Sequence, residues 1–249
     1  MKQIFVLLLV IVNACVAFSQ KEKQAKHTQT MHFIFQNTVG DSLLQTGVTY
    51  TNAFGEPFTI RAFKYYVSGI QLQYADSSSY KVNTAPHLIN EADSSSKQLH
   101  FTAPEGTVTG IQFLLGVDSL VNTTGVQAGD LDPAKGMYWV WNTGYIMAKL
   151  EGFSPAAKSP AHQFTYDIGG YKQGENATRT ITLSVPFVNH QQMSLSQNNF
   201  IIKADALKWF TGVNDIQIAA QPMCHEPGTL AMQIADNYQQ MFSVKKDHD

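Results

Sequence analysis

The feature of this sequence that most limits its fold is a series of short segments in which apolar and polar residues alternate. In residues 31–37, for example, Phe33 and Phe35 fall on one face, and residues 110–116 repeat the pattern. The same kind of segment recurs at 61–74, 145–151, 164–168, 178–185 and 200–203. Period-two alternation, interrupted by Gly, Ser, Asn and Asp turns, is typical of antiparallel sheets. We therefore expect a mainly β chain that folds as one antiparallel β-sandwich-like domain over residues 30–246.

Apolar residues near the C-terminus follow a different period, with steps of four, four and three positions. They are Leu230, Ile234, Tyr238 and Met241. Because these steps bring side chains to one face of a helix, we expect a short C-terminal helix that packs on the sheet through this face.

The N-terminal segment has the features of a secretory signal. A lysine at position 2 precedes an apolar run at residues 4–12, which is too short to span a bilayer. Small residues before position 20 favour cleavage after Ser19, which gives a signal peptide over 1–19 and a polar, flexible leader over 20–29. The alternative is a lipoprotein signal that ends at Cys15. We expect a periplasmic or extracellular protein with no transmembrane segment in the mature chain.

Composition excludes several classes of function. Charged residues make up only 14% of the chain and the formal net charge is −2, so nothing favours nucleic acid as a partner. Cleavage after Ser19 would leave Cys224 as the sole cysteine, and an internal disulfide would then be impossible. The sequence lacks a nucleophile elbow, a phosphate loop, a dinucleotide-binding glycine pattern and a zinc-protease motif. We therefore expect that the protein is not an enzyme.

Histidines are the candidate metal ligands, and the chain has eight of them. His32 lies in a predicted strand and faces away from Phe33. His225 lies between Cys224 and Glu226, but neighbouring strand residues point to opposite faces, so three in a row rarely bind one ion. The alternative for each histidine is a solvated or hydrogen-bonded ring with no metal.

The strongest local feature is an aromatic segment at residues 136–145. It contains Tyr138, Trp139 and Trp141, and on a strand the two tryptophans would share one face. Such a cluster can simply be part of the core, since aromatic rings bury a large area. The functional alternatives are a stacking platform for sugars and a redox-active aromatic site.

This segment and several others, in order along the chain, resemble the MbnP-like family, exported proteins associated with methanobactin and copper handling. The other segments are residues 65–72, 113–119, 129–131, 150–152, 164–170 and 234–238. The resemblance implies a β-sandwich-like periplasmic protein. It also implies that a tryptophan of the Trp-x-Trp segment, Trp139 or Trp141, is oxidised to kynurenine by a partner di-haem peroxidase of MauG type. The oxidised residue and histidines would then bind copper, and a TonB-type receptor is a further partner of such systems.

The chain departs from the copper pattern of this family at two positions. Relatives often have histidine where this chain has Tyr138 and Asp167. Imidazole suits copper well, whereas a phenol is a poor ligand and a carboxylate prefers harder ions. With His32 and His225 as the remaining nitrogen donors, three hypotheses stay open: a metal-binding protein, a module that binds a sugar or another small molecule, and a family member that has lost the metal site.

Overall fold

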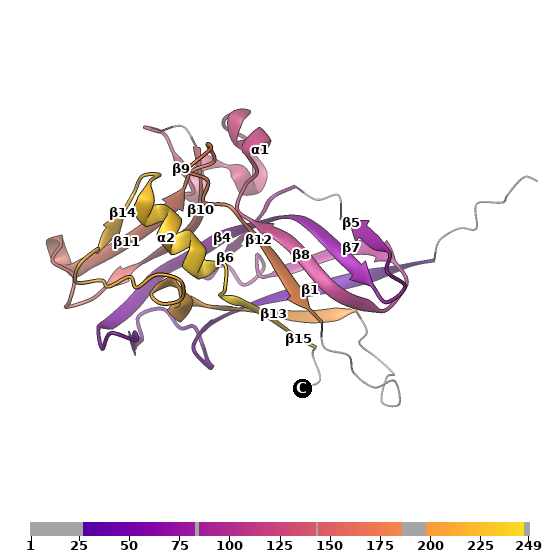
Figure 1. Ribbon diagram of the computed structural model, residues 1–249, viewed down its shortest axis with the longest axis horizontal. Coiled ribbons are helices and arrows are strands. Elements are labelled where there is room, and N and C mark those ends of the chain that lie inside the picture. The colour runs from indigo at the N-terminus through magenta and orange to yellow at the C-terminus, as the bar shows by residue number, and fades with distance from the viewer. Residues whose placement is uncertain (1–26, 83–84, 143, 186–197, 247–249) are drawn as a thin grey trace, which may run out of the picture.

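A computed structural model describes residues 27–82, 85–142, 144–185 and 198–246. The predicted signal peptide and the leader up to residue 26 lie outside these residues. Strands dominate, in two hydrogen-bonded sheets, which confirms the predicted β-sandwich-like fold class (Figure 1). None of the described helices is long and apolar enough to cross a membrane.

The larger sheet has the strand order β12-β8-β4-β10-β11-β14. These strands are β12 (Arg179–Ser184), β8 (Val108–Leu115), β4 (Pro57–Tyr74), β10 (Gly144–Phe153), β11 (Gln163–Gly169) and β14 (Met223–Cys224). The long central strand β4 also pairs with β3 (Thr49–Thr51), β5 (Ser79–Lys81) and β6 (His87–Asn90), and β10 pairs with β9 (Tyr138–Trp139). Pairing between β11 and β14 is parallel, in contrast to the antiparallel pairs predicted.

The smaller sheet has the order β15-β13-β1-β2, and β7 pairs with β1 on the edge away from β13. Its strands are β15 (Phe242–Lys246), β13 (Asn199–Asp205), β1 (Thr28–Val39), β2 (Ser42–Leu43) and β7 (Gln98–Pro104). Strand β1 begins at Thr28, so the last residues of the predicted leader are part of this sheet. The pairing of β1 with β13 is parallel and the pairing of β1 with β7 is antiparallel.

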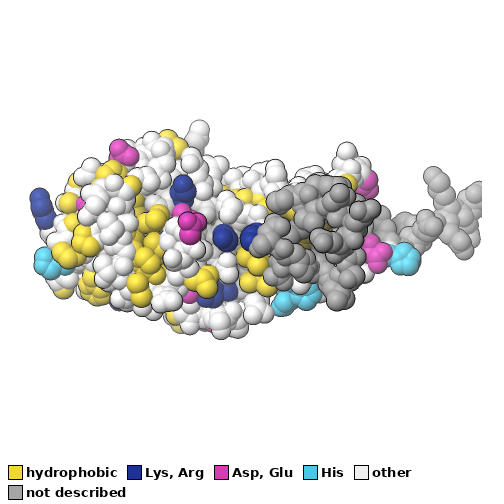
Figure 2. Space-filling model, turned by 90° about the horizontal axis from the view of Figure 1, so that it is seen from below, with side chains coloured by type: hydrophobic (Ala, Val, Ile, Leu, Met, Phe, Trp, Pro, Cys, Tyr) yellow, Lys and Arg dark blue, Asp and Glu magenta, His cyan; other side chains and the backbone are white. Residues whose placement is uncertain are grey.

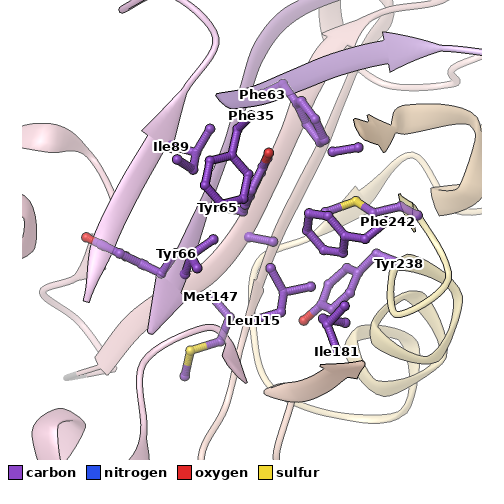
Figure 3. Packing of buried hydrophobic residues seen from close by; sticks show 14 of the residues in the cluster. Phe35, Phe63, Tyr65, Tyr66, Ile89, Leu115, Met147, Ile181, Tyr238 and Phe242 are labelled. Carbon is purple, nitrogen blue, oxygen red and sulfur yellow. The ribbon is translucent and has the colours of Figure 1, made fainter. Parts of the chain in front are cut away.

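The alternating residues of both sheets meet in an aromatic core. Phe35 of β1 and Tyr65 of β4 are fully buried, with ring centroids 6.3 Å apart, and Phe242 lies 5.5 Å from Tyr65 (Figure 3). The hydroxyl of Tyr65 donates to Asn37 Oδ1 at 2.8 Å, so its polar end is satisfied inside the core. Aromatic packing of this kind holds the two sheets together, and Cys224, the cysteine among the described residues, is free.

The predicted C-terminal helix is present as α2 (Thr229–Tyr238). Ile234, Tyr238 and Met241 are buried, and Leu230 is half-buried against the core, as the spacing predicts. The helix contacts β11 and the short 3-10 helix η5 (Ala206–Trp209). It therefore supports the end of the larger sheet that carries β11 and β14 (Figure 1).

The remaining helical elements are short. They are α1 (Ser119–Thr123) and the 3-10 helices η1 (Gly129–Leu131), η2 (Pro133–Lys135) and η3 (Pro160–His162). Charged side chains are scattered over the face of the molecule seen in Figure 2, with no single field of one sign.

Candidate functional site

The two tryptophans of the aromatic segment lie together where β9 meets β10. Their ring centroids are 5.4 Å apart with an interplanar angle of 37°. Trp139 is only 5% exposed, whereas Trp141 is 61% exposed. The expectation that both belong to one strand is wrong, because β9 ends at Trp139 and Trp141 lies in the following turn. The turn nevertheless places the Trp141 ring against the Trp139 ring.

Trp139 is buried because the neighbouring strand leaves room for its ring. The ring packs over Gly169 of β11, where an added Cβ would lie 2.6 Å from the indole. That distance is shorter than any ordinary contact, so a side chain at position 169 would displace the ring. The glycine is thus required for space at this position.

Asp167 lies two residues before Gly169 on β11, and therefore on the same face of the sheet. Directly opposite on β10 is Lys149, whose Nζ is 2.7 Å from Asp167 Oδ1 and 2.7 Å from Glu151 Oε1. The lysine is 9% exposed. Burial raises the pKa of the Asp167 carboxyl, and the adjacent Lys149 ammonium partly offsets this effect. A cation of the protein itself therefore already occupies the position beside Asp167.

His225 follows directly after β14, which pairs with β11. Its Nδ1 is 3.9 Å from Asp167 Oδ2. Trp141 and His225 line one cleft of about 410 Å³, together with Glu226 and Pro227. Four of the predicted site residues are thus brought to one end of the larger sheet: Trp139, Trp141, Asp167 and His225. We call this region the tryptophan end: Trp139, Trp141, Lys149, Asp167 and His225.

Two other polar groups near the tryptophan end are poorly suited to bind a metal. Cys224 is buried, and burial raises the pKa of its thiol to about 11, which keeps it protonated at neutral pH. Tyr138, a predicted site residue, places its ring edge-on to Tyr145 at a centroid distance of 5.0 Å. Its position on β9 next to Trp139 turns it to the other side of the strand.

His32 does not belong to this group. It lies on β1 of the smaller sheet, directly opposite His100 of β7, and the two Nδ1 atoms are 2.7 Å apart. Sequence reasoning missed this pairing because no strand was predicted over residues 98–104. The alternation of Leu99, Phe101 and Ala103 toward the core is the signal that could have revealed it.

The donor chemistry at the tryptophan end does not make a complete metal site. Among the described residues, no group of three or more His, Cys, Asp or Glu side chains could hold a metal ion. His225 supplies one nitrogen, and the oxygen of Asp167 that is nearest to Lys149 is already ion-paired. A buried ammonium beside the carboxylate would repel a second cation. The residues present therefore do not fit a copper ion in their unmodified form.

Two comparisons relate this architecture to known proteins. The sequence profile of MbnP matches residues 28–226. Among solved structures, the chain is similar to MbnP from Methylosinus trichosporium, with 13% sequence identity and a TM-score of 0.59, and the match covers 89% of this chain and 99% of that chain. None of the curated proteins compared matches the chain. The first match spans most of the sequence, and the second supports the fold.

Proposed function

The chain belongs to the MbnP family, and we propose that it is an exported, non-enzymatic protein whose tryptophan pair is the oxidisable part of a copper-binding site. The observation that carries the proposal is the position of Trp141, which is exposed, stacked on Trp139, and lines the same cleft as His225. An exposed ring is accessible to a partner enzyme. A buried ring in contact with it can share the charge of an oxidised intermediate.

Oxidation would supply the donors that the unmodified residues lack. Two molecules of hydrogen peroxide supply the two oxygen atoms that open the indole ring to N-formylkynurenine, and two molecules of water are released. Hydrolysis then releases formate and leaves kynurenine. The product carries an aromatic amine and a ketone in place of the indole. We propose Trp141 as the residue modified, with a di-haem peroxidase of MauG type as the source of oxidising equivalents and a TonB-type receptor as a second partner of the system.

The unmodified tryptophan end is then expected to bind copper weakly. His225 is a suitable nitrogen donor, but Asp167 is a carboxylate and is neutralised by Lys149. The proposal therefore depends on the covalent state of the tryptophan pair, and that state can be measured.

The test is the intact mass and metal content of the protein purified from its own extracytoplasmic compartment. We expect the mass of the kynurenine form in the parent and in Trp139→Phe, and the unmodified mass in Trp141→Phe. The modified forms should carry more copper per chain than the unmodified Trp141→Phe protein. An unmodified parent without copper would contradict the proposal and favour a family member that has lost its site.

A second function is favoured by the clefts on either side of Trp141. Besides the cleft shared with His225, the ring lines one of about 250 Å³ with Tyr171, Lys172 and Glu175. An exposed indole beside a second aromatic ring is a platform on which a sugar can stack. Quenching of tryptophan fluorescence by a neutral sugar, lost in Trp141→Ala, would favour this function over copper binding if the native protein proves unmodified.

A further inference from the structure

The smaller sheet holds a second pair of histidines at a distance suited to chelation, away from the tryptophan end. His32 on β1 and His100 on β7 are directly opposite in the antiparallel register, with ring centroids 4.6 Å apart. Their neighbours Phe33 and Phe101 point into the core, so both imidazoles lie on the outer face of the sheet. His100 is exposed and His32 is half-buried.

The backbone holds these two side chains close together. The amide of His32 donates to Asn198 O at 2.8 Å, on the side of β1 that faces β13. The backbone of His32 therefore makes no hydrogen bond to β7. His32 and His100 form a non-hydrogen-bonded pair, the kind of antiparallel pair in which opposite side chains approach most closely. The rings are positioned by the sheet itself, which reduces the conformational entropy lost when they bind an ion.

The contact between the rings requires one shared proton. Their Nδ1 atoms are 2.7 Å apart, which is possible only if one nitrogen donates and the other accepts. In the described part of the chain, no ion pair links either ring to a carboxylate.

We propose that His32 and His100 bind a divalent transition-metal ion between their two Nδ1 atoms. The proton on the donor Nδ1 then moves to the Nε2 atom of the same ring. With metal–nitrogen bonds of about 2.0–2.1 Å, two ligands at angles of about 90–110° stand roughly 3–3.4 Å apart. The rings need to separate by only a few tenths of an ångström to reach this spacing. Water completes the coordination, because the pair faces solvent. Imidazole ligands and the order of divalent affinities make Cu²⁺ the ion bound most tightly.

The test is a calorimetric titration of the purified protein with Cu²⁺, in parent, His32→Ala and His100→Ala. Each substitution should weaken the tightest binding by at least about tenfold, because either one leaves a single imidazole. Electron paramagnetic resonance of the parent complex should show two equivalent nitrogen donors, and each variant should show one fewer. Unchanged affinity in either variant would overturn the proposal.

A matched control removes a histidine from elsewhere on the surface. His162→Asn is suitable because His162 is exposed and has a positive φ of 55°, a conformation that Asn adopts readily. This variant should bind Cu²⁺ like the parent, and an equal loss would mean general binding to histidines, which also overturns the proposal. His100→Gln, compared with the parent by thermal unfolding without metal, separates loss of binding from loss of fold.

The site does not depend on the function proposed for the tryptophan end. The double variant Trp139→Phe/Trp141→Phe should retain the Cu²⁺ binding of the histidine pair in full. Loss of binding in that variant alone would place the ion at the tryptophan end and refute the histidine-pair site. Loss in His32→Ala and His100→Ala alone would support the histidine pair, whatever the covalent state of the tryptophans.

Discussion

The two histidines that the sequence singled out, His32 and His225, lie in regions that differ in how charge is balanced. At the tryptophan end, His225 is near Asp167, but Lys149 already neutralises that carboxylate. In the smaller sheet, the His32 ring contacts a second imidazole, that of His100. The tryptophan end contains its own cation, Lys149. The histidine pair contains a hydrogen bond between two imidazoles, and a metal ion can take the place of this bond.

The identity of a side chain alone therefore does not decide whether it can bind an ion, because the charges around it also matter. A carboxylate beside an internal ammonium is electrostatically satisfied, and a second cation must displace or repel the first. In the described part of the chain, no ammonium group is paired with the two imidazoles of His32 and His100. Three kinds of substitution test this difference. They remove the packing of helix α2 beside the tryptophan end, the internal cation Lys149, or the buried carboxyl of Asp167.

The largest effect is expected from removing the support of the tryptophan end at helix α2. Ile234 is fully buried, and Ile234→Asp would bury an unpaired charge. We expect the free energy of unfolding to fall by more than about 4 kcal/mol, measured by urea denaturation. Gln240→Asp, at an exposed position just after the helix, should change it by less than about 0.5 kcal/mol. A melting temperature for Ile234→Asp within a few degrees of the parent would mean that the helix is not docked.

A smaller loss of stability is expected from removing the internal cation, Lys149. Lys149→Met would leave Asp167 and Glu151 with one fewer positive partner in a largely buried position. Breaking a buried ion pair on one side typically costs about 3–5 kcal/mol, although Arg61, which also pairs with Glu151, should moderate the loss. Urea denaturation of Lys149→Met and of the exposed control Lys158→Met gives the comparison.

The double variant Lys149→Met/Asp167→Asn sharpens this test. If Lys149 mainly neutralises Asp167, the second substitution should recover part of the stability lost in the first. A double variant that is less stable than Lys149→Met would show that Asp167 is held by other groups, and the tryptophan end would no longer differ from the histidine pair as described.

Sequence reasoning recovered the fold better than the site, for physical reasons. The period-two segments predicted the main strands and the four-four-three spacing predicted α2, because local burial patterns encode both. The proximity of Asp167, His225 and the tryptophans depends on the pairing of β14 with β11, which involves residues far apart in the chain. Neither the Lys149–Asp167 pair nor the His32–His100 pair has a local signature, since cross-strand register sets both.

The smallest effect concerns the protonation of Asp167. Burial raises its pKa above the ordinary value of 3.8, so the folded protein holds the proton more tightly than the unfolded chain. The stabilisation from this proton is fully present below the unfolded pKa and is lost as pH rises through the folded pKa. The parent should therefore lose stability relative to Asp167→Asn as pH rises from below 3.8 through the folded pKa of Asp167. At higher pH the difference in free energy of unfolding between the two proteins should stay constant.

Urea denaturation of both proteins over a series of pH values measures this difference, and titrations of distant groups cancel in it. Asp215→Asn, at an exposed carboxylate, serves as the control and should track the parent across the series. If the parent instead gains stability relative to Asp167→Asn as pH rises, the attraction of Lys149 outweighs the effect of burial, and the pKa of Asp167 is lowered in the folded protein. Asp167 would then be a carboxylate held ionised by Lys149, and removing the lysine would free a negative charge for a metal ion at the tryptophan end.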